Sequence, residues 1–363
     1  MLKGHESLKS TVTRAAETLR ALLAEVSLLE VEAIDEAPPA RGAQGGGDLR
    51  MKVRSAGRPT YVLSCQWMPN GQPRQIRAAL LELRDSGHST DPMTLPVVMA
   101  PYLSTDAQAL CRAQGAGFLD LEGNARLVFD GVFIERRVAS RPPVERRALK
   151  GLFTAKAAQV LRVLLRDPLR AWRLADLATA AQVSLGHASN VRNALLEREW
   201  ARVVDGGLCL AEPQRLLDAW RVAYRPPPGR RELFYTSLHG RLLDEAILRV
   251  MSAAAGQARI ALASFSAANW LAPYGRIALH SFYADEPGLE RLRDGLALAP
   301  AAQGENLMVI LPKEPGVFLD TLEPVPGLIC TSPVQTYLDL SVAGERGQEA
   351  AAHLRRERLS WRT

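Results

Sequence analysis

The chain has 363 residues, of which 47% are apolar and 23% charged, and this composition excludes disordered, collagen-like and low-complexity proteins. A chain of this length is expected to form two or three domains. From the sequence we also expect no membrane-spanning helix and no signal peptide. Its four cysteines lie far apart and form no Cys-x-x-Cys pair, so we expect reduced thiols in a cytoplasmic protein without a zinc site.

Positive charge is concentrated in the middle of the chain. Residues 136–231 hold 19 Lys and Arg against 8 Asp and Glu, a net charge of +11, whereas the whole chain carries +6. The flanking segments are therefore negative overall, which indicates that the middle segment contacts a polyanion. Most of the basic residues are arginines, which bind phosphate and guanine bidentately, although a GC-rich genome would also favour arginine codons.

Two proline-rich breaks divide the sequence into three predicted domains. Paired prolines lie within residues 140–150, and three consecutive prolines lie within residues 225–231, where they predict a stiff linker with a glycine hinge. We therefore expect an α/β domain at residues 1–140, a second domain at residues 148–224 and another α/β domain at residues 232–363.

Helices and strands alternate in the first predicted domain. Apolar spacing predicts helices over residues 8–29, 73–84 and 105–114, and strands over residues 48–53, 61–65, 95–99, 117–120, 125–129 and 132–136. This order of helix, two strands, helix, strand, helix and short strands resembles the restriction-endonuclease-like (PD-(D/E)XK) fold.

Active members of that fold hold a divalent cation with an Asp at the start of one strand and an acid-x-Lys triplet on the next. Asp48 stands at the first position, but the second strand reads Ser64-Cys65-Gln66 and lacks both the carboxylate and the lysine. A single carboxylate does not supply the several oxygen ligands that such a cation needs. We therefore expect an inactive domain, with no catalytic residue, metal or other cofactor.

The segment Asp120-Leu-Glu122-Gly-Asn124 admits two interpretations. Its carboxylates could form a metal site, or it could be the end of a strand followed by a tight turn. Glu-Gly-Asn accommodates left-handed backbone conformations, so we favour the turn.

The middle segment has the strongest pattern in the sequence. Ser184 is a good N-cap, and Asp205-Gly206-Gly207 is typical of a hairpin turn. Apolar spacing predicts helices over residues 153–165, 172–181 and 185–199, followed by strands over residues 200–204 and 208–210. Helix, helix, turn, helix and two-stranded hairpin together predict a winged helix-turn-helix.

The third of these helices carries short polar and basic side chains of the kind that reach base edges in the major groove. Basic residues on flanking elements are expected to contact phosphates. A winged helix that binds protein is the alternative, but the surrounding positive charge favours DNA. The predicted DNA-binding residues are Gly186, His187, Ser189, Asn190, Arg192 and Asn193 on the helix, with Arg202, Arg173, Arg170 and Lys156 around it.

The last predicted domain is also α/β. A nucleotidyltransferase would need a Gly-Ser pair followed by Asp-x-Asp on a strand, and Ala263-Ser264-Phe265 offers neither. We therefore assign this domain no chemistry. Strands are expected over residues 259–263, 277–283, 306–311 and 328–330, and helices over residues 238–253, 266–271, 332–340 and 345–359.

Five segments resemble the AbiEi-type antitoxin family of type IV toxin-antitoxin, or abortive-infection, systems. They are Ser332-Pro-Val-Gln-Thr-Tyr-Leu-Asp-Leu340, the following Gly344-Glu-Arg-Gly347 and Glu349-Ala-Ala-Ala-His-Leu354, Ser266-Ala-Ala-Asn-Trp-Leu-Ala-Pro273, and Gly115-Ala-Gly-Phe-Leu-Asp-Leu-Glu-Gly-Asn124. The resemblance implies a DNA-binding repressor of its own operon, paired with a nucleotidyltransferase toxin encoded beside it.

Hypotheses from different functional classes stay open. The first is a non-enzymatic regulator and antitoxin that binds double-stranded DNA through residues 150–215. The second is a metal-dependent nuclease directed to DNA by the winged helix, and the third is a ligand-sensing transcription factor. The Ser64-Cys65-Gln66 triplet favours the first. The oligomeric state, including a homodimer, is left open.

Overall fold

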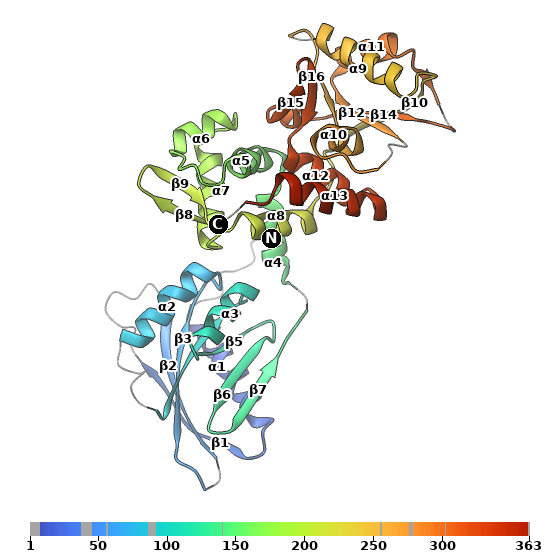
Figure 1. The fold of residues 1–363 in the computed structure, drawn as a ribbon. Helices are drawn as coiled ribbons and strands as arrows, with labels where there is room; N and C mark the ends of the chain where they lie inside the picture. Colours follow the sequence, from blue (N-terminus) through green and yellow to red (C-terminus); the bar gives the residue numbers. More distant parts are fainter. Residues whose placement is uncertain are drawn as a thin grey trace. The chain divides into compact units, whose positions relative to one another are not determined.

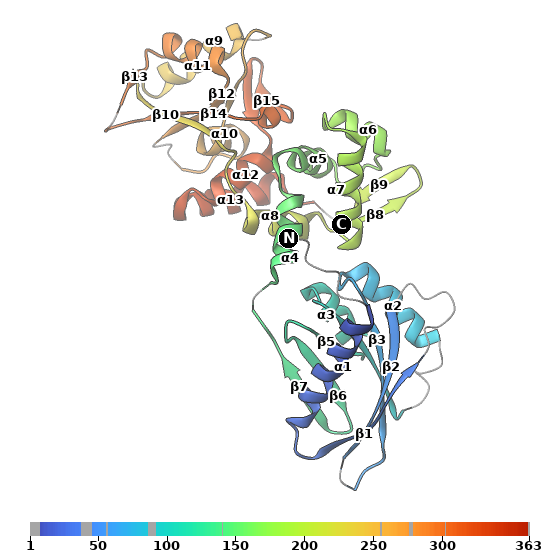
Figure 2. The ribbon, with the colours of Figure 1, turned by 180° about the vertical axis from the view of Figure 1, so that it is seen from behind.

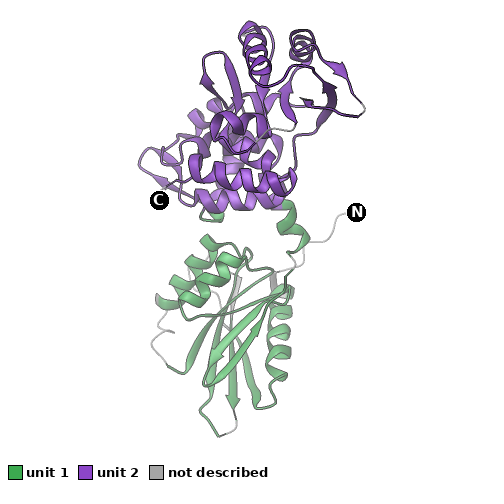
Figure 3. Cartoon of the chain, turned by 45° about the vertical axis from the view of Figure 1, so that its right-hand side comes forward, with its two compact units in different colours: residues 1–147, 196–199 green, residues 148–195, 200–363 purple. Residues whose placement is uncertain are grey.

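The computed structural model describes residues 8–37, 46–55, 57–85, 92–139, 141–254, 256–275, 279–301 and 303–361. Unit 1 holds residues 1–147 with 196–199, and unit 2 holds residues 148–195 with 200–363 (Figure 3). Each unit combines helices with a mixed sheet, so the chain is an α/β multidomain protein, as predicted. Each helix in the described ranges is too short or too polar to cross a membrane.

Unit 1 is built on a seven-stranded sheet whose strands lie in chain order. The pairs β3–β4 and β4–β5 are parallel, and the other pairs are antiparallel. Parallel neighbours need a crossover connection, which α2 (Pro73–Asp85) and α3 (Thr105–Ala113) supply. The strands are β1 (Leu29–Ala37), β2 (Gly46–Ser55), β3 (Tyr61–Trp67), β4 (Thr94–Ala100), β5 (Gly117–Asp120), β6 (Ala125–Phe129) and β7 (Val132–Arg136).

Two apolar cores cover the two faces of this sheet (Figures 1 and 2). On one face, Leu19 of α1 (Leu8–Ala24) belongs to the same buried cluster as Met51 of β2. On the other face, Ile76 of α2 is clustered with Phe118 of β5. The sheet is thus buried between one helix and a pair of helices.

The prediction of two strands before α2 is wrong, because the structure has three. The first helix ends at Ala24 rather than near residue 29, and β1 follows it. This strand is rich in glutamate, and a bulge shifts its register between Val31 and Ala33. The bulge interrupts the alternation of apolar and polar residues by which a strand is recognised in a sequence.

Unit 2 begins with a group of helices and a hairpin. The predicted break at residues 140–150 is mostly helical, since α4 (Pro143–Leu152) covers it, and proline is well accommodated in the first turn of a helix. The elements that follow are α5 (Ala155–Arg166), α6 (Leu174–Ala180), α7 (Leu185–Glu197), β8 (Ala201–Val204), β9 (Gly207–Leu210) and α8 (Pro213–Ala223).

The rest of unit 2 is a second seven-stranded sheet with helices on both faces. Its order is β13-β10-β14-β12-β11-β16-β15. Helices α9 and α11 lie on one face, and α10, α12 and α13 lie on the other (Figure 1). The strands are β10 (Gly229–Tyr235), β11 (Ile260–Leu262), β12 (His280–Ala284), β13 (Ala299–Pro300), β14 (Leu307–Pro312), β15 (Thr321–Val325) and β16 (Leu328–Thr331). The helices are α9 (Arg241–Ala254), α10 (Ser264–Leu271), α11 (Glu286–Gly295), α12 (Pro333–Ser341) and α13 (Gly344–Arg358).

The predicted linker at residues 225–231 is in part a strand. Gly229 begins β10, which pairs with β14, so this glycine is not a hinge. A Cβ atom at Gly229 would lie 2.2 Å from the carbonyl oxygen of Leu311, which shows how closely the two backbones approach. The helices and the C-terminal sheet therefore belong to one unit, and a boundary between residues 224 and 232 stays a prediction.

A buried hydrogen-bond network joins the helices to this sheet. Arg162 of α5 donates from Nη1 to Oε1 of Gln335 (3.0 Å) and from Nη2 to the carbonyl of Gly316 (2.7 Å). The Nε2 atom of Gln335 donates to the Tyr224 hydroxyl (2.8 Å) and to Oδ1 of Asp339 (3.0 Å). Burial lowers the pKa of Arg162.

Asp339 is the acceptor at the centre of this network. It accepts a hydrogen bond from the hydroxyl of Tyr224, at the end of α8. It accepts another, of 3.2 Å, from the hydroxyl of Tyr283 on β12. Ser332 caps α12 by accepting the backbone N–H of Gln335, which sets the helix that carries both Gln335 and Asp339. The segment at residues 332–340, which resembles a family motif, thus has a structural role: it fixes α5 and α8 against the sheet.

The stability of unit 2 should depend on the titration of Asp339. Burial raises the pKa of this carboxyl to about 6, against about 3.9 in an unfolded chain. The unfolded chain therefore loses this proton first, so the stabilising contribution is complete below about pH 4 and is lost as the pH rises through about 6. A shift of about two units corresponds to about 3 kcal/mol.

Asp339→Asn removes this titration. Urea denaturation should show that the wild type loses about 3 kcal/mol relative to the variant between about pH 4 and pH 7. Asp294→Asn, at an exposed position on α11, should keep the wild-type profile. Parallel pH profiles for the wild type and Asp339→Asn would contradict the assignment.

Candidate nucleic-acid interface

Helix α7 carries six of the predicted DNA-binding residues. It begins as predicted at a cap, because the Ser184 hydroxyl accepts the backbone N–H of His187 at 3.2 Å. Its buried face consists of Ala188, Val191 and Leu195, which are 0, 4 and 0% exposed. This spacing of three and four residues anchors one side of the helix and leaves the other side free to meet a ligand.

The six predicted residues on α7 differ in their exposure. Gly186, Asn190 and Asn193 are exposed, whereas Ser189 and Arg192 are half-buried. A Cβ atom at Gly186 would meet no atom within 4 Å, so the start of the helix is open to close approach by a partner. Arg192 contacts its neighbour Asn193 at 3.3 Å, from Nη1 to Oδ1.

His187 is less accessible than the sequence suggested. Its side chain is half-buried, and its Nε2 atom is enclosed without a hydrogen-bond partner among the described residues. The expectation that all six side chains face solvent is therefore wrong for this residue. Its neighbours at Gly186 and Asn190 present the more accessible surface.

The hairpin after α7 is held by a residue that precedes α6. Trp172 pairs with Leu208 of β9 through two backbone hydrogen bonds of 2.8 Å. Gly207 lies directly under this pairing, with a φ of +149°. A Cβ atom there would lie 2.1 Å from the Trp172 carbonyl oxygen, so only glycine allows the approach. The sequence predicted a hairpin turn at Gly207 but not the pairing of the hairpin with Trp172.

Three basic residues flank α7 at exposed positions. Arg202 lies on β8, Arg173 occupies the N-cap position of α6, and Lys156 lies in the first turn of α5. The Arg170 guanidinium lies 3.8 Å from the centre of the Trp172 ring, a cation–π contact that restricts its motion. These four residues place positive charge on α5, on β8 and on the segment that leads into α6.

In unit 1, strand β3 carries no carboxylate at the position expected for the acid-x-Lys triplet of a nuclease. In the register of β2 and β3, Asp48 pairs with Gln66, but the Asp48 side chain lies outside the described residues. Gln66 is buried and donates from Nε2 to Oε2 of Glu82 at 2.9 Å. Cys65 is buried as well, and burial raises the pKa of its thiol, which disfavours the nucleophilic thiolate.

Asp120 has a structural role, and the prediction of a turn is confirmed. Its carboxylate is fully buried and accepts the backbone N–H groups of Leu103 (3.0 Å), Glu122 (3.1 Å) and Asn124 (2.9 Å), together with the Asn124 amide (2.8 Å). The carboxylate thus closes the turn between β5 and β6. Across the described ranges, no three His, Cys, Asp or Glu side chains are grouped closely enough to hold a metal ion.

Residues 209–360 match a family described as "Transcriptional regulator, AbiEi antitoxin, Type IV TA system". The match confirms the resemblance that the sequence indicated for this part of the chain. A solved structure titled "Structure of EndoMS in apo form" shares 13% identity with a TM-score of 0.21, over 30% of this chain and 45% of that one. The chain thus spans less than half of that protein. A search of curated proteins gave no match.

Two glycines of this region provide a matched test of the geometry. Gly207→Ala should lower the free energy of unfolding by about 2–3 kcal/mol, because the new methyl group collides with the Trp172 carbonyl. Gly186→Ala should raise it by up to about 1 kcal/mol, since alanine favours helix and meets open space. Urea denaturation of both variants measures the difference, and equal stabilities would refute the close approach of β9 to Trp172.

Proposed function

We propose that this chain is a DNA-binding transcriptional regulator that represses its own operon as the antitoxin of a type IV toxin-antitoxin system. The family match at residues 209–360 supports the regulatory and antitoxin parts of the proposal. The DNA-binding part is supported by the helices α5, α6 and α7 with the hairpin β8–β9, which we interpret as a winged helix-turn-helix. The partners would be double-stranded DNA and a nucleotidyltransferase toxin encoded nearby, in the cytoplasm.

One observation carries the proposal. Helix α7 buries Ala188, Val191 and Leu195 and exposes Gly186, Asn190 and Asn193, within a segment whose net charge is +11. An exposed asparagine in the first two turns of a recognition helix can bond adenine through its amide, and surrounding arginines bind phosphates. A helix that only covered the core would need no such combination.

Asn190→Ala and Arg202→Ala should separate base reading from phosphate contact. Asn190→Ala should cost about 1–3 kcal/mol on the promoter of the chain's own gene and little on scrambled DNA. Arg202→Ala should weaken both complexes nearly equally and reduce the dependence of log K on log salt by about one unit. Gel-shift titrations at several salt concentrations measure both effects.

Arg241→Ala serves as the control for loss of one positive charge, since Arg241 is exposed on α9, away from the helices that form the proposed winged helix. It should bind both DNAs like the wild type. If Asn190→Ala loses the same affinity on promoter and scrambled DNA, α7 does not read sequence at this position.

The nuclease hypothesis makes the opposite prediction for unit 1. We expect the full chain to leave plasmid DNA uncut in the presence of Mg²⁺ or Mn²⁺, because β3 offers Ser64-Cys65-Gln66 where a metal-dependent nuclease needs an acid and a lysine. Agarose gels of a time course measure the outcome. Cleavage that disappears in Asp48→Ala would overturn the proposal of a non-enzymatic protein.

A further inference from the structure

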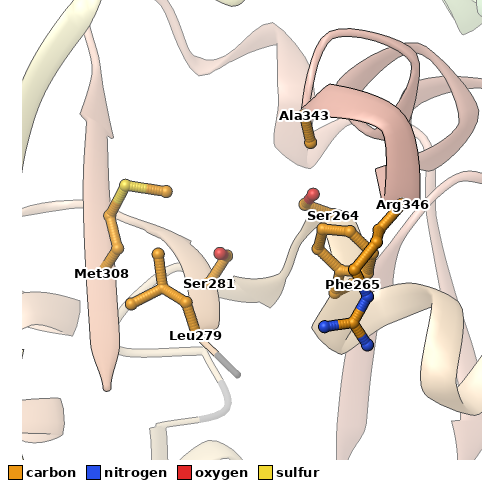
Figure 4. A pocket seen from close by; sticks show the side chains of 7 residues that line it. All are labelled: Ser264, Phe265, Leu279, Ser281, Met308, Ala343 and Arg346. Atoms are coloured by element: carbon orange, nitrogen blue, oxygen red, sulfur yellow. The ribbon is translucent and has the colours of Figure 1, made fainter. Parts of the chain in front are cut away.

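A cavity of about 300 Å³ opens between the C-terminal sheet and two helices of unit 2 (Figure 4). One side carries the beginning of α10 and the beginning of α13, and the other side carries residues of β12, β14 and the chain before β12. Its lining residues are Ser264, Phe265, Leu279, Ser281, Met308, Ala343 and Arg346. This volume lies at the lower end of the range for small-molecule sites.

Two helix N-termini meet this cavity without a side-chain cap. Ala263 and Ala343 hold the N-cap positions of α10 and α13, and alanine has no side chain that accepts the N–H groups of the first turn. Both helix ends therefore contribute partial positive charge to the cavity. Ser264, the first residue of α10, has a φ of +48°, a strained conformation for a residue other than glycine.

The Ser281 hydroxyl gives a second and independent indication of a ligand. Its side chain is only 3% exposed, and Figure 4 shows the hydroxyl directed into the cavity. The backbone N–H of Ser281 is bonded to Ser266, but among the described residues its hydroxyl has no hydrogen-bond partner. The hydroxyl is reached from the cavity, so a molecule bound there can form a hydrogen bond with it.

Charge and polarity are unevenly distributed over the cavity wall. Arg346 of α13 brings a guanidinium group to one side, together with the Ser264 hydroxyl (Figure 4). Glu345 also lies in the first turn of α13 and reduces the net field there, but it does not line the cavity. The remaining wall is apolar and is formed by Phe265, Leu279 and Met308.

We propose that this cavity binds a small organic anion, whose carboxylate or phosphate head contacts Ser264, Ser281 and Arg346 while an apolar body packs on Phe265, Leu279 and Met308. This site goes beyond the proposed function and does not depend on DNA binding. It would give unit 2 a ligand-binding activity separate from the α7 surface.

The test is isothermal titration calorimetry of the full chain with three probes: sodium benzoate, adenosine monophosphate and inorganic phosphate. Benzoate and the nucleotide each join an anionic head to a flat ring, with a carboxylate in one and a phosphate in the other. At least one of them should bind in the submillimolar range, at least tenfold more tightly than inorganic phosphate. The probe that binds identifies the head group.

Two variants and one control locate the binding. Arg346→Gln should weaken the bound probe about tenfold, as expected for loss of a charge-assisted hydrogen bond. Ser281→Ala should weaken it about threefold to tenfold by loss of the hydroxyl. Arg241→Gln, which removes an exposed charge on the opposite face of the sheet, should bind within twofold of the wild type.

Arg346 is exposed, so its variant is expected to fold even if Ser281→Ala does not. The probes are tested up to about 10 mM, a concentration at which even weak binding is detected. If none of the three probes binds, the proposal is overturned. Wild-type affinity in Arg346→Gln, or inorganic phosphate binding as tightly as the ring-bearing probes, would also overturn it.

Discussion

The network centred on Asp339 determines where the helices of unit 2 sit on their sheet. It takes Arg162 from α5, Tyr224 from the end of α8, and Gln335 and Asp339 from α12. Burying a guanidinium and a carboxylate costs several kcal/mol each, and the cost is offset only where hydrogen bonds are made in the right geometry. A polar contact of this kind therefore tolerates fewer arrangements than an apolar one, which fixes α5 and α8 against the C-terminal sheet.

The sequence predicted helices and strands well where apolar residues recur at a regular spacing and where capping or turn residues mark the ends of the element. The helices predicted over residues 73–84 and 105–114 and the strands β5, β6 and β7 follow directly from spacing and turn residues. The failures have local causes as well. A bulge conceals β1, and the three prolines before Gly229 suggested a linker where β10 begins. Strand pairing decides such cases, and pairing is not visible in one stretch of sequence.

The sequence predicted only the part of the candidate interface that lies on the single helix α7. The periodicity of Ala188, Val191 and Leu195 identified the buried side of α7, so the exposure of Asn190 and Asn193 followed. The enclosure of the His187 ring, the pairing of Trp172 with Leu208 and the cavity beside Ser281 each depend on residues distant in the chain. No spacing rule reports such contacts, so the sequence did not predict them.

Several polar groups on the strands of unit 1 are buried, and this bears on where function lies. The Gln66 amide is bonded to Glu82, the Cys65 thiol is buried, and the Asp120 carboxylate closes a turn with four hydrogen bonds. A group that is already bonded within the fold, such as the Asp120 carboxylate, cannot also coordinate a cation or activate water without breaking those bonds, at about 1–3 kcal/mol for each partner left unpaired. Asn190 on α7 differs from these groups because its side chain is exposed. It can therefore bind a partner at little cost to the stability of the fold. This difference supports our proposal of DNA recognition at α7 rather than metal-dependent chemistry at β3.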